Sequence, residues 1–229
     1  MNRYMNTFFE EVPWQFSRDS IVEIYEEKIE LSESFAGIFP NMANLLSKAV
    51  KMTVILQDGT KYWLFFWEGE NGIGGWLCEP RQKQDTSERT AKHKLAIREI
   101  GNIIESFGFS DVRDDYICNM NWVLGGDEVS YGIEGWEDYF RECCEEEHVA
   151  PDIDLEHLVV FAEEANGNLT LCNTTSEEIL LFAHDHCFDY VESCENCPEY
   201  TFYTIKGVTS CTEYIEAVAK QWLGYLLIF

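Results

Sequence analysis

The sequence predicts an α+β protein with a mainly antiparallel sheet flanked by helices. Segments with helical and with strand periodicity occur in separate runs along the chain, which is typical of this class. A β-hairpin pattern lies in the first third, and short apolar runs separated by turn residues fill the last third. With 229 residues and 46% hydrophobic side chains, the chain can build a packed core. No fixed-period repeat is visible.

The N-terminal region, residues 1–90, is predicted to be a helix-plus-hairpin extension. Ser20 and Glu23 have the spacing of a capping box, and apolar residues follow at helical spacing, which predicts a helix over 20–32. A shorter helix is expected over 41–49. Strand patterns at 52–56 and 62–67 flank the turn at 57–60 and predict the hairpin.

The segment 70–75 contains three glycines and is expected to be a flexible turn. It is a poor phosphate-binding loop, because no Lys or helix-opening Ser/Thr follows it. The polar stretch 81–89 is expected to be a linker. Next, a helix is predicted from Thr90 to Phe107, closed by Gly108. Six of the 16 basic residues lie between Arg81 and Arg98, and we expect this helix face to pair with the acidic half.

The C-terminal region, residues 91–229, is predicted to be an acidic α+β domain. A turn at 125–127 precedes a helix over 135–144, and a closing helix is expected over 212–223. Strands are predicted at 158–162, 169–172, 179–183 and 200–205. A two-stranded hairpin cannot bury its own apolar face, so the two regions should form one unit. The apolar segment 223–229 is expected to pack on the first region or, alternatively, to make a homodimer contact.

Charge is very unevenly distributed along the chain, whose formal net charge is −26. Residues 1–100 carry 12 basic and 15 acidic side chains, whereas residues 101–229 carry 4 and 27, a net of −23. Such a field repels nucleic acid and anionic membranes and favours a basic protein as partner. The alternative interpretation is that the acidity only keeps the protein soluble.

The sequence predicts a cytoplasmic location with reduced thiols. The first residues lack the apolar segment of a signal peptide, and the apolar run 222–229 is too short to span a bilayer. Nine cysteines, an odd number, do not form an obvious disulfide framework. No cofactor is predicted, and either a monomer or a homodimer is compatible with the sequence.

Residues 91–225 resemble the SUKH superfamily in their order of helices, glycine turns and strands. The helix from Thr90, the turn at 125–127 and the aromatic helix at 136–140 are similar to its opening. Strand, Gly167-Asn168 turn, strand, the return at 178–185 and the closing helix at 210–222 are similar to its second part. The middle turn often reads Gly-Asp in the family, and residues 1–90 have no clear counterpart there. The resemblance implies a bacterial immunity protein that neutralises a toxin, plausibly a nuclease.

Paired and clustered carboxylates are the candidate partner-binding residues for a non-enzymatic binding protein. Such pairs arise readily in so acidic a chain, so they carry no specific signal for glycosidase chemistry. As a charge array they would face Lys and Arg of a partner. The candidates are Glu137, Asp138, Glu145, Glu146, Glu147, Glu163, Glu164, Glu177 and Glu178.

The alternative is a metal-dependent enzyme or zinc-stabilised regulator built on residues 184–197. Cys194 and Cys197 have the two-residue gap that allows two thiolates to bind one tetrahedral metal ion. His184 and His186 would lie on one side of a strand, with Cys187 beside them. Strong zinc motifs carry two well-spaced pairs, however, and a second pair is missing here. We therefore expect no bound metal, and less than about one zinc ion per chain.

Overall fold

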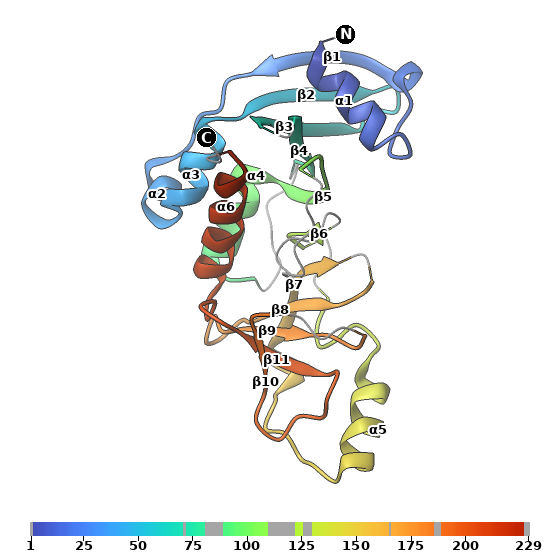
Figure 1. The fold of residues 1–229 in the computed structure, drawn as a ribbon, viewed down its shortest axis with the longest axis vertical. Helices are drawn as coiled ribbons and strands as arrows, with labels where there is room; N and C mark the ends of the chain where they lie inside the picture. The colour runs from blue at the N-terminus through green and yellow to red at the C-terminus, as the bar shows by residue number, and fades with distance from the viewer. Residues whose placement is uncertain are drawn as a thin grey trace.

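The computed structural model of the protein describes residues 2–70, 72–80, 89–109, 122–125, 130–164, 166–185 and 189–226. In these residues the chain forms two antiparallel sheets, which follow each other along the longest dimension of the molecule (Figure 1). Helices lie beside both sheets and at the far end of the second. This is the α+β architecture that the sequence predicts.

The first sheet has the strand order β1-β2-β3-β4-β5. The predicted hairpin is confirmed as β2 and β3, joined by a turn in which Gly59 has φ +86°. Helix α1 (Arg3–Glu11) covers one face of the sheet, where Phe8 packs on Phe107 with ring centroids 5.5 Å apart. The strands are β1 (Ile21–Glu27), β2 (Val50–Leu56), β3 (Lys61–Gly69), β4 (Gly72–Glu79) and β5 (Asn102–Phe107).

The second sheet has the order β10-β11-β9-β8-β7-β6. The strands predicted at 158–162, 169–172, 179–183 and 200–205 are confirmed, with small differences in their ends. Helix α5 (Glu137–Glu147) packs against this sheet and confirms the helix predicted at 135–144. The strands are β6 (Trp122–Val123), β7 (Leu158–Glu164), β8 (Leu169–Asn173), β9 (Ile179–Phe182), β10 (Val191–Ser193) and β11 (Phe202–Ile205).

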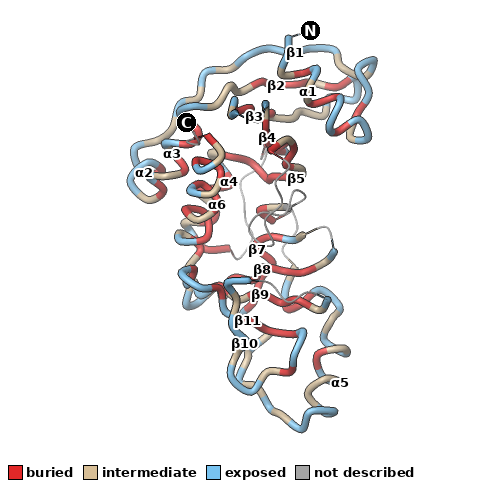
Figure 2. The backbone as a smooth tube through the Cα atoms, viewed as in Figure 1, coloured by how far each residue is buried: buried red, intermediate tan, exposed pale blue. Residues whose placement is uncertain are grey.

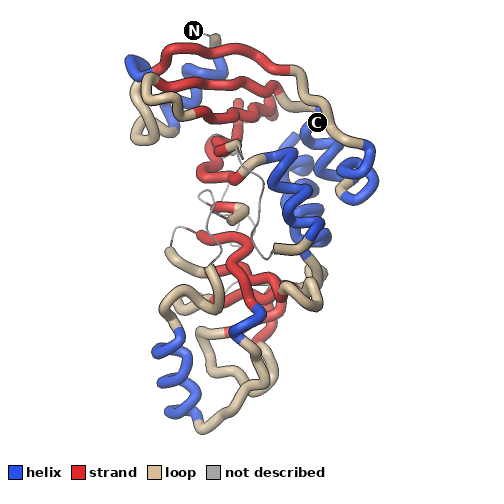
Figure 3. Tube along the Cα trace, turned by 180° about the vertical axis from the view of Figure 1, so that it is seen from behind, coloured by secondary structure: helices blue, strands red, loops and turns tan. Residues whose placement is uncertain are grey.

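Four helices join the two sheets through one shared core. They lie along the same side of the molecule, seen from behind in Figure 3, and Figure 2 shows buried segments running continuously past them. Phe65 and Trp67 of β3 belong to the same buried cluster as Phe161 of β7 and Trp222 of the last helix. Leu223 and Leu226 are also buried there, while residues 227–229 lie outside the described residues. The helices are α2 (Glu33–Ile38), α3 (Pro40–Ser47), α4 (Ala91–Ile100) and α6 (Cys211–Leu226).

The residue-90 division used above falls within this shared structure. Strand β5 and helix α4 come after it, but β5 completes the first sheet by pairing with β4. Strand β6 of the second sheet then lies beside β5. The expected linker at 81–89 is outside the described residues except for Arg89, which is buried. Among the described helices, none has both the length and the apolar character that a bilayer crossing requires.

The predicted helix over 20–32 is wrong, because these residues form the edge strand β1. The Ser20 hydroxyl donates a hydrogen bond to the Ser17 carbonyl, 2.6 Å away, instead of capping a helix. Ile21, Val22 and Ile24 are β-branched and suit a strand, and β1 pairs antiparallel with β2. Pairing with the neighbouring strand therefore outweighs the helical spacing.

The flexible turn expected at 70–75 is also wrong from Gly72 onward, where β4 begins. The glycines allow aromatic rings to approach the strand closely. A Cβ atom on Gly74 would overlap the ring of Phe109, and one on Gly75 would overlap the ring of Phe107. These two glycines therefore serve packing and not flexibility.

The helix predicted from Thr90 to Phe107 is right only in its first part. Thr90 caps α4 by accepting a hydrogen bond from the His93 amide at 3.1 Å. The helix stops at Gly101, whose φ of +82° lies in the left-handed region. Ile103 and Ile104 then serve opposite faces of the sheet as part of β5. Apolar residues needed on both faces imitate helical spacing.

Candidate partner-binding surface

Helix α5 turns an apolar side toward the second sheet and an acidic side outward. Phe140 is its one buried residue, and its ring lies 4.9 Å from that of Phe202. Trp136 and Tyr139 flank it and contact Phe182. The helix stands at the end of the molecule, far from the first sheet (Figure 1). Its exposed carboxylates, here called the α5 acidic surface, are Glu137, Asp138, Glu142, Glu145, Glu146 and Glu147.

These charges are arranged differently at the two ends of α5. Glu137 and Asp138 lie in the first turn, where the helix dipole favours negative charge. Glu145, Glu146 and Glu147 lie in the last turn, where the dipole disfavours it, and no basic residue accompanies them there. The helix then ends at His148 in a left-handed conformation, with φ +56°. Three exposed carboxylates thus occupy positions that weaken the helix itself.

Two members of the α5 acidic surface already have partners within the chain. Asp138 forms an ion pair with Arg141 at 2.7 Å. Glu137 accepts a hydrogen bond from the Ile133 amide at 3.3 Å, across the turn that begins the helix. Both serve the first turn of α5, so the carboxylates further along the helix are better placed to meet another molecule.

The predicted residues Glu163 and Glu164 lie at the end of β7 and differ in their surroundings. Partial burial raises the pKa of Glu163 above its ordinary value, and the nearby charge of Glu134 adds to this effect. Glu164 accepts a hydrogen bond from the Asn168 side-chain amide. Because Glu134 lies three residues before α5, it brings the charge of Glu163 toward that helix.

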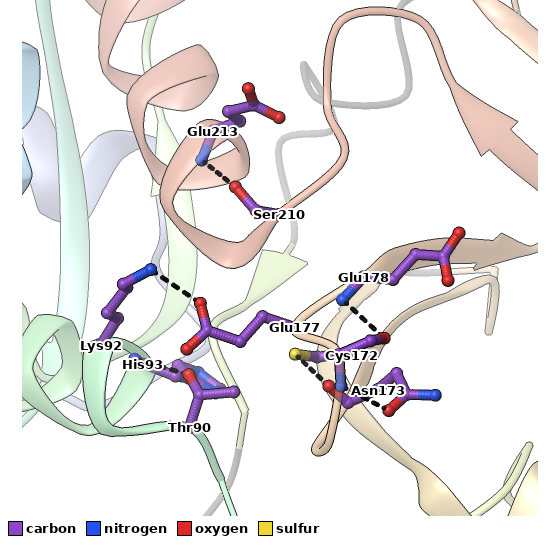
Figure 4. Close-up of polar contacts among 10 residues, drawn as sticks. Thr90, Lys92, His93, Cys172, Asn173, Glu177, Glu178, Ser210 and Glu213 are labelled. Atoms are coloured by element: carbon purple, nitrogen blue, oxygen red, sulfur yellow. Dashed lines mark hydrogen bonds and ion pairs between the residues drawn. The ribbon is translucent and has the colours of Figure 1, made fainter.

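Glu177 and Glu178 lie in the turn between β8 and β9, near α4. Lys92 of α4 contacts Glu177 at 2.8 Å (Figure 4), so the basic helix does pair with an acid of the second half, as expected. The Glu178 amide donates a hydrogen bond to the Ser176 hydroxyl at 3.3 Å. Glu177 therefore has a role within the fold and is separated in function from the α5 acidic surface.

The predicted metal cluster is only partly covered by the described residues. The His184 ring stacks on Trp136 at 4.0 Å, and its amide donates to Asn168 Oδ1 at 3.1 Å. Cys194 and Cys197 lie at the tip between β10 and β11, while His186 and Cys187 fall outside the described residues. In the described part of the chain, no three His, Cys, Asp or Glu side chains are grouped as metal ligands.

The chain matches no protein-family model, no curated protein and no solved structure at a significant level. The site therefore stands on its own geometry. Sequence reasoning missed two members of it, Glu142 and Glu134. Glu142 follows Asp138 by four residues and precedes Glu146 by four, so helical spacing could have placed it on the same face.

Proposed function

We propose that this protein is a non-enzymatic binding protein that neutralises a basic protein through the α5 acidic surface. The observation that carries the proposal is the outward side of α5, which bears six carboxylates and one basic residue, Arg141. Arg141 is already paired with Asp138. A surface of this kind complements Lys and Arg side chains on a partner.

The placement of Glu145, Glu146 and Glu147 strengthens the proposal. Acidic residues in the last turn of a helix cost stability, typically about 0.3–1 kcal/mol each when exposed and at low ionic strength. Positions that oppose local stability are expected mainly where a sequence serves function. A partner that supplies cations at the carboxyl end of α5 would relieve this repulsion on binding.

The resemblance of residues 91–225 to the SUKH superfamily adds the kind of partner. In that interpretation the chain is a bacterial immunity protein, and the partner is a toxin domain with a basic surface, such as a nuclease. An acidic helix that covers the basic site of a nuclease would compete directly with its phosphate-containing substrate. The proposal thus explains why the charge gathers in the second half.

The test uses the basic toxin domain encoded beside this gene as the partner and measures its association with the intact chain. The association rate should fall at least about tenfold between 0.01 M and 1 M ionic strength, since the Debye length shrinks from about 30 Å to about 3 Å. The variant Glu142→Lys/Glu145→Lys/Glu146→Lys should lose this salt dependence and most of the affinity.

A matched control changes charge at the other end of the molecule. Glu10 and Glu11 are exposed acids in the last turn of α1, on the first sheet. Glu10→Lys/Glu11→Lys should bind the partner as the unchanged chain does. If the two sets of substitutions weaken binding equally, or if salt has no effect on the association rate, the α5 acidic surface is not the binding site.

A further inference from the structure

A second feature near α5 involves two thiols in one tight turn. Cys194 follows β10 directly, and Cys197 lies three residues later, before β11. The Cys197 amide donates a hydrogen bond to the Cys194 carbonyl at 3.2 Å, which closes a β-turn. Asn196, at the third position of this turn, has φ +55°, a conformation that Asn tolerates well.

The turn holds the two thiols in the geometry of a disulfide precursor. In a β-turn the first and fourth Cα atoms lie within about 7 Å, and disulfides span about 4.4–6.8 Å between Cα atoms. The thiols are close enough for a hydrogen bond between them, yet both cysteines are free. The Cys194 amide also donates to the Phe202 carbonyl at 2.9 Å, which fixes the turn to β11.

We propose that Cys194 and Cys197 are a redox modification site that forms a reversible disulfide by exchange with a low-molecular-weight disulfide such as oxidised glutathione. The Cys194 thiolate attacks one sulfur of oxidised glutathione, and one glutathione thiolate leaves. The Cys197 thiol then gives its proton to solvent and attacks the Cys194 sulfur, which releases the second glutathione. Two cysteine thiols are oxidised, and one glutathione disulfide is reduced to two thiols.

The surroundings give the two thiols different roles. The hydrogen bond from Cys197 lowers the pKa of Cys194, although burial and the charge of Glu178 act against it. The same hydrogen bond raises the pKa of Cys197. Because the thiolate is the attacking species, Cys194 reacts first and Cys197 resolves the mixed disulfide.

The other described cysteines are poorer candidates. Cys78, Cys172 and Cys211 are buried, and burial raises the pKa of Cys172 to about 12. Cys143 and Cys144 are neighbours on α5, so their side chains project in different directions and cannot form a disulfide together. Both are partly exposed, which makes them suitable controls for thiol access.

The experiment exposes the full-length protein to oxidised glutathione, blocks free thiols by alkylation and maps all peptides by mass spectrometry. The peptide that contains residues 194–197 should lose two hydrogen atoms and escape alkylation. Cys197→Ser should instead accumulate one glutathione on Cys194, because the resolving thiol is missing. Cys143→Ser and Cys144→Ser should form the disulfide as the unchanged chain does.

Two results would overturn the inference. One is a folded chain in which residues 194–197 remain fully alkylated after oxidation. The other is a disulfide from Cys194 to a different cysteine, including Cys118 or Cys187. A measurement without substitutions guards against folding defects in the variants: in the native chain, Cys194 should be alkylated faster than Cys143 or Cys144. Equal rates would also contradict the proposal. None of these readouts depends on the proposed partner.

Discussion

Trp222 of α6 and Phe140 of α5 are large, buried aromatic residues on helices, but their surroundings differ greatly. Trp222 lies among the rings of Trp67, Trp76 and Phe109, at centroid distances of 5.2, 5.3 and 5.5 Å. Helix α6 buries nine residues, whereas α5 buries Phe140 alone. One helix joins the two sheets, and the other is held by a narrow apolar contact. A helix that contributes little to the core is free to present charge outward.

The largest predicted effect follows from removing the aromatic ring at the centre of the shared core. Trp222→Ala should lower the free energy of unfolding by about 3–5 kcal/mol, because it leaves a cavity between rings from both sheets. Urea unfolding followed by circular dichroism measures this change. Trp14→Ala is the control, since Trp14 is 66% exposed, and should change stability by no more than about 0.5 kcal/mol.

The same experiment tests whether the two sheets unfold together. The unchanged chain should unfold in one transition, because the shared core includes residues from both sheets. Two separate transitions in the unchanged chain, or equal effects of Trp222→Ala and Trp14→Ala, would contradict the role given to this core.

A smaller loss is expected where a glycine admits an aromatic ring. Gly74→Ala should lower the free energy of unfolding by about 1–3 kcal/mol, because its Cβ would overlap the ring of Phe109. Gly37→Ala is the matched control in α2, where nothing lies within 4 Å of the added Cβ. It should be neutral or stabilise the helix by up to about 1 kcal/mol. Equal effects of the two substitutions in thermal unfolding would show that Gly74 is not a packing glycine.

These glycines also mark the limit of prediction from the sequence. Turn chemistry at Gly59 and the apolar runs of β7, β8 and β9 are local signals, and they predict the hairpin and most of the second sheet correctly. Gly74 and Gly75 form part of a strand only because Phe109 and Phe107, about 30 residues away, pack on them. The helical spacing at Ile21 and Ile24 is likewise outweighed by pairing with β2. Contacts distant in sequence decided both cases.

The candidate site shows the same division. Helical spacing predicts α5 and its row of carboxylates without any knowledge of the fold. The separate role of Glu177 depends on Lys92, which is 85 residues away in the chain and reaches it only after folding. Local pattern therefore predicts which acids exist on one helix, while tertiary contacts decide which of them are occupied.

A carboxylate on the first sheet provides a pH-dependent comparison with the acidic half. Partial burial raises the pKa of Glu105 from 4.5 to about 7. The folded protein then binds this proton more tightly than the unfolded chain does, so its contribution to stability is lost as pH rises from about 4.5 to 7. Glu105→Gln should raise the melting temperature at about pH 8 and change it little near pH 4.5.

The control for Glu105 lies on the neighbouring strand. Glu79 of β4 is exposed, and Glu79→Gln should give no comparable gain at the higher pH. A melting temperature that rises equally at both pH values in Glu105→Gln would point to packing of the amide, and not to titration of the carboxyl group.

The smallest predicted effect concerns the cost of the α5 acidic surface. Neutralising the last turn with Glu145→Gln/Glu146→Gln/Glu147→Gln should raise the free energy of unfolding by about 1 kcal/mol in total at low ionic strength, since each acid opposes the helix dipole. The gain should disappear near 1 M salt, where the Debye length is about 3 Å. Glu137→Gln/Asp138→Gln in the first turn should have the opposite sign, because those acids favour the dipole and Asp138 pairs with Arg141. Urea midpoints at both salt concentrations separate the two sets. If the last-turn variant is more stable but binds the basic partner less well, the chain gives up helix stability for binding at this end. A last-turn variant that is less stable than the unchanged chain would mean that these carboxylates support the fold, and the argument that they are kept for a partner would fail.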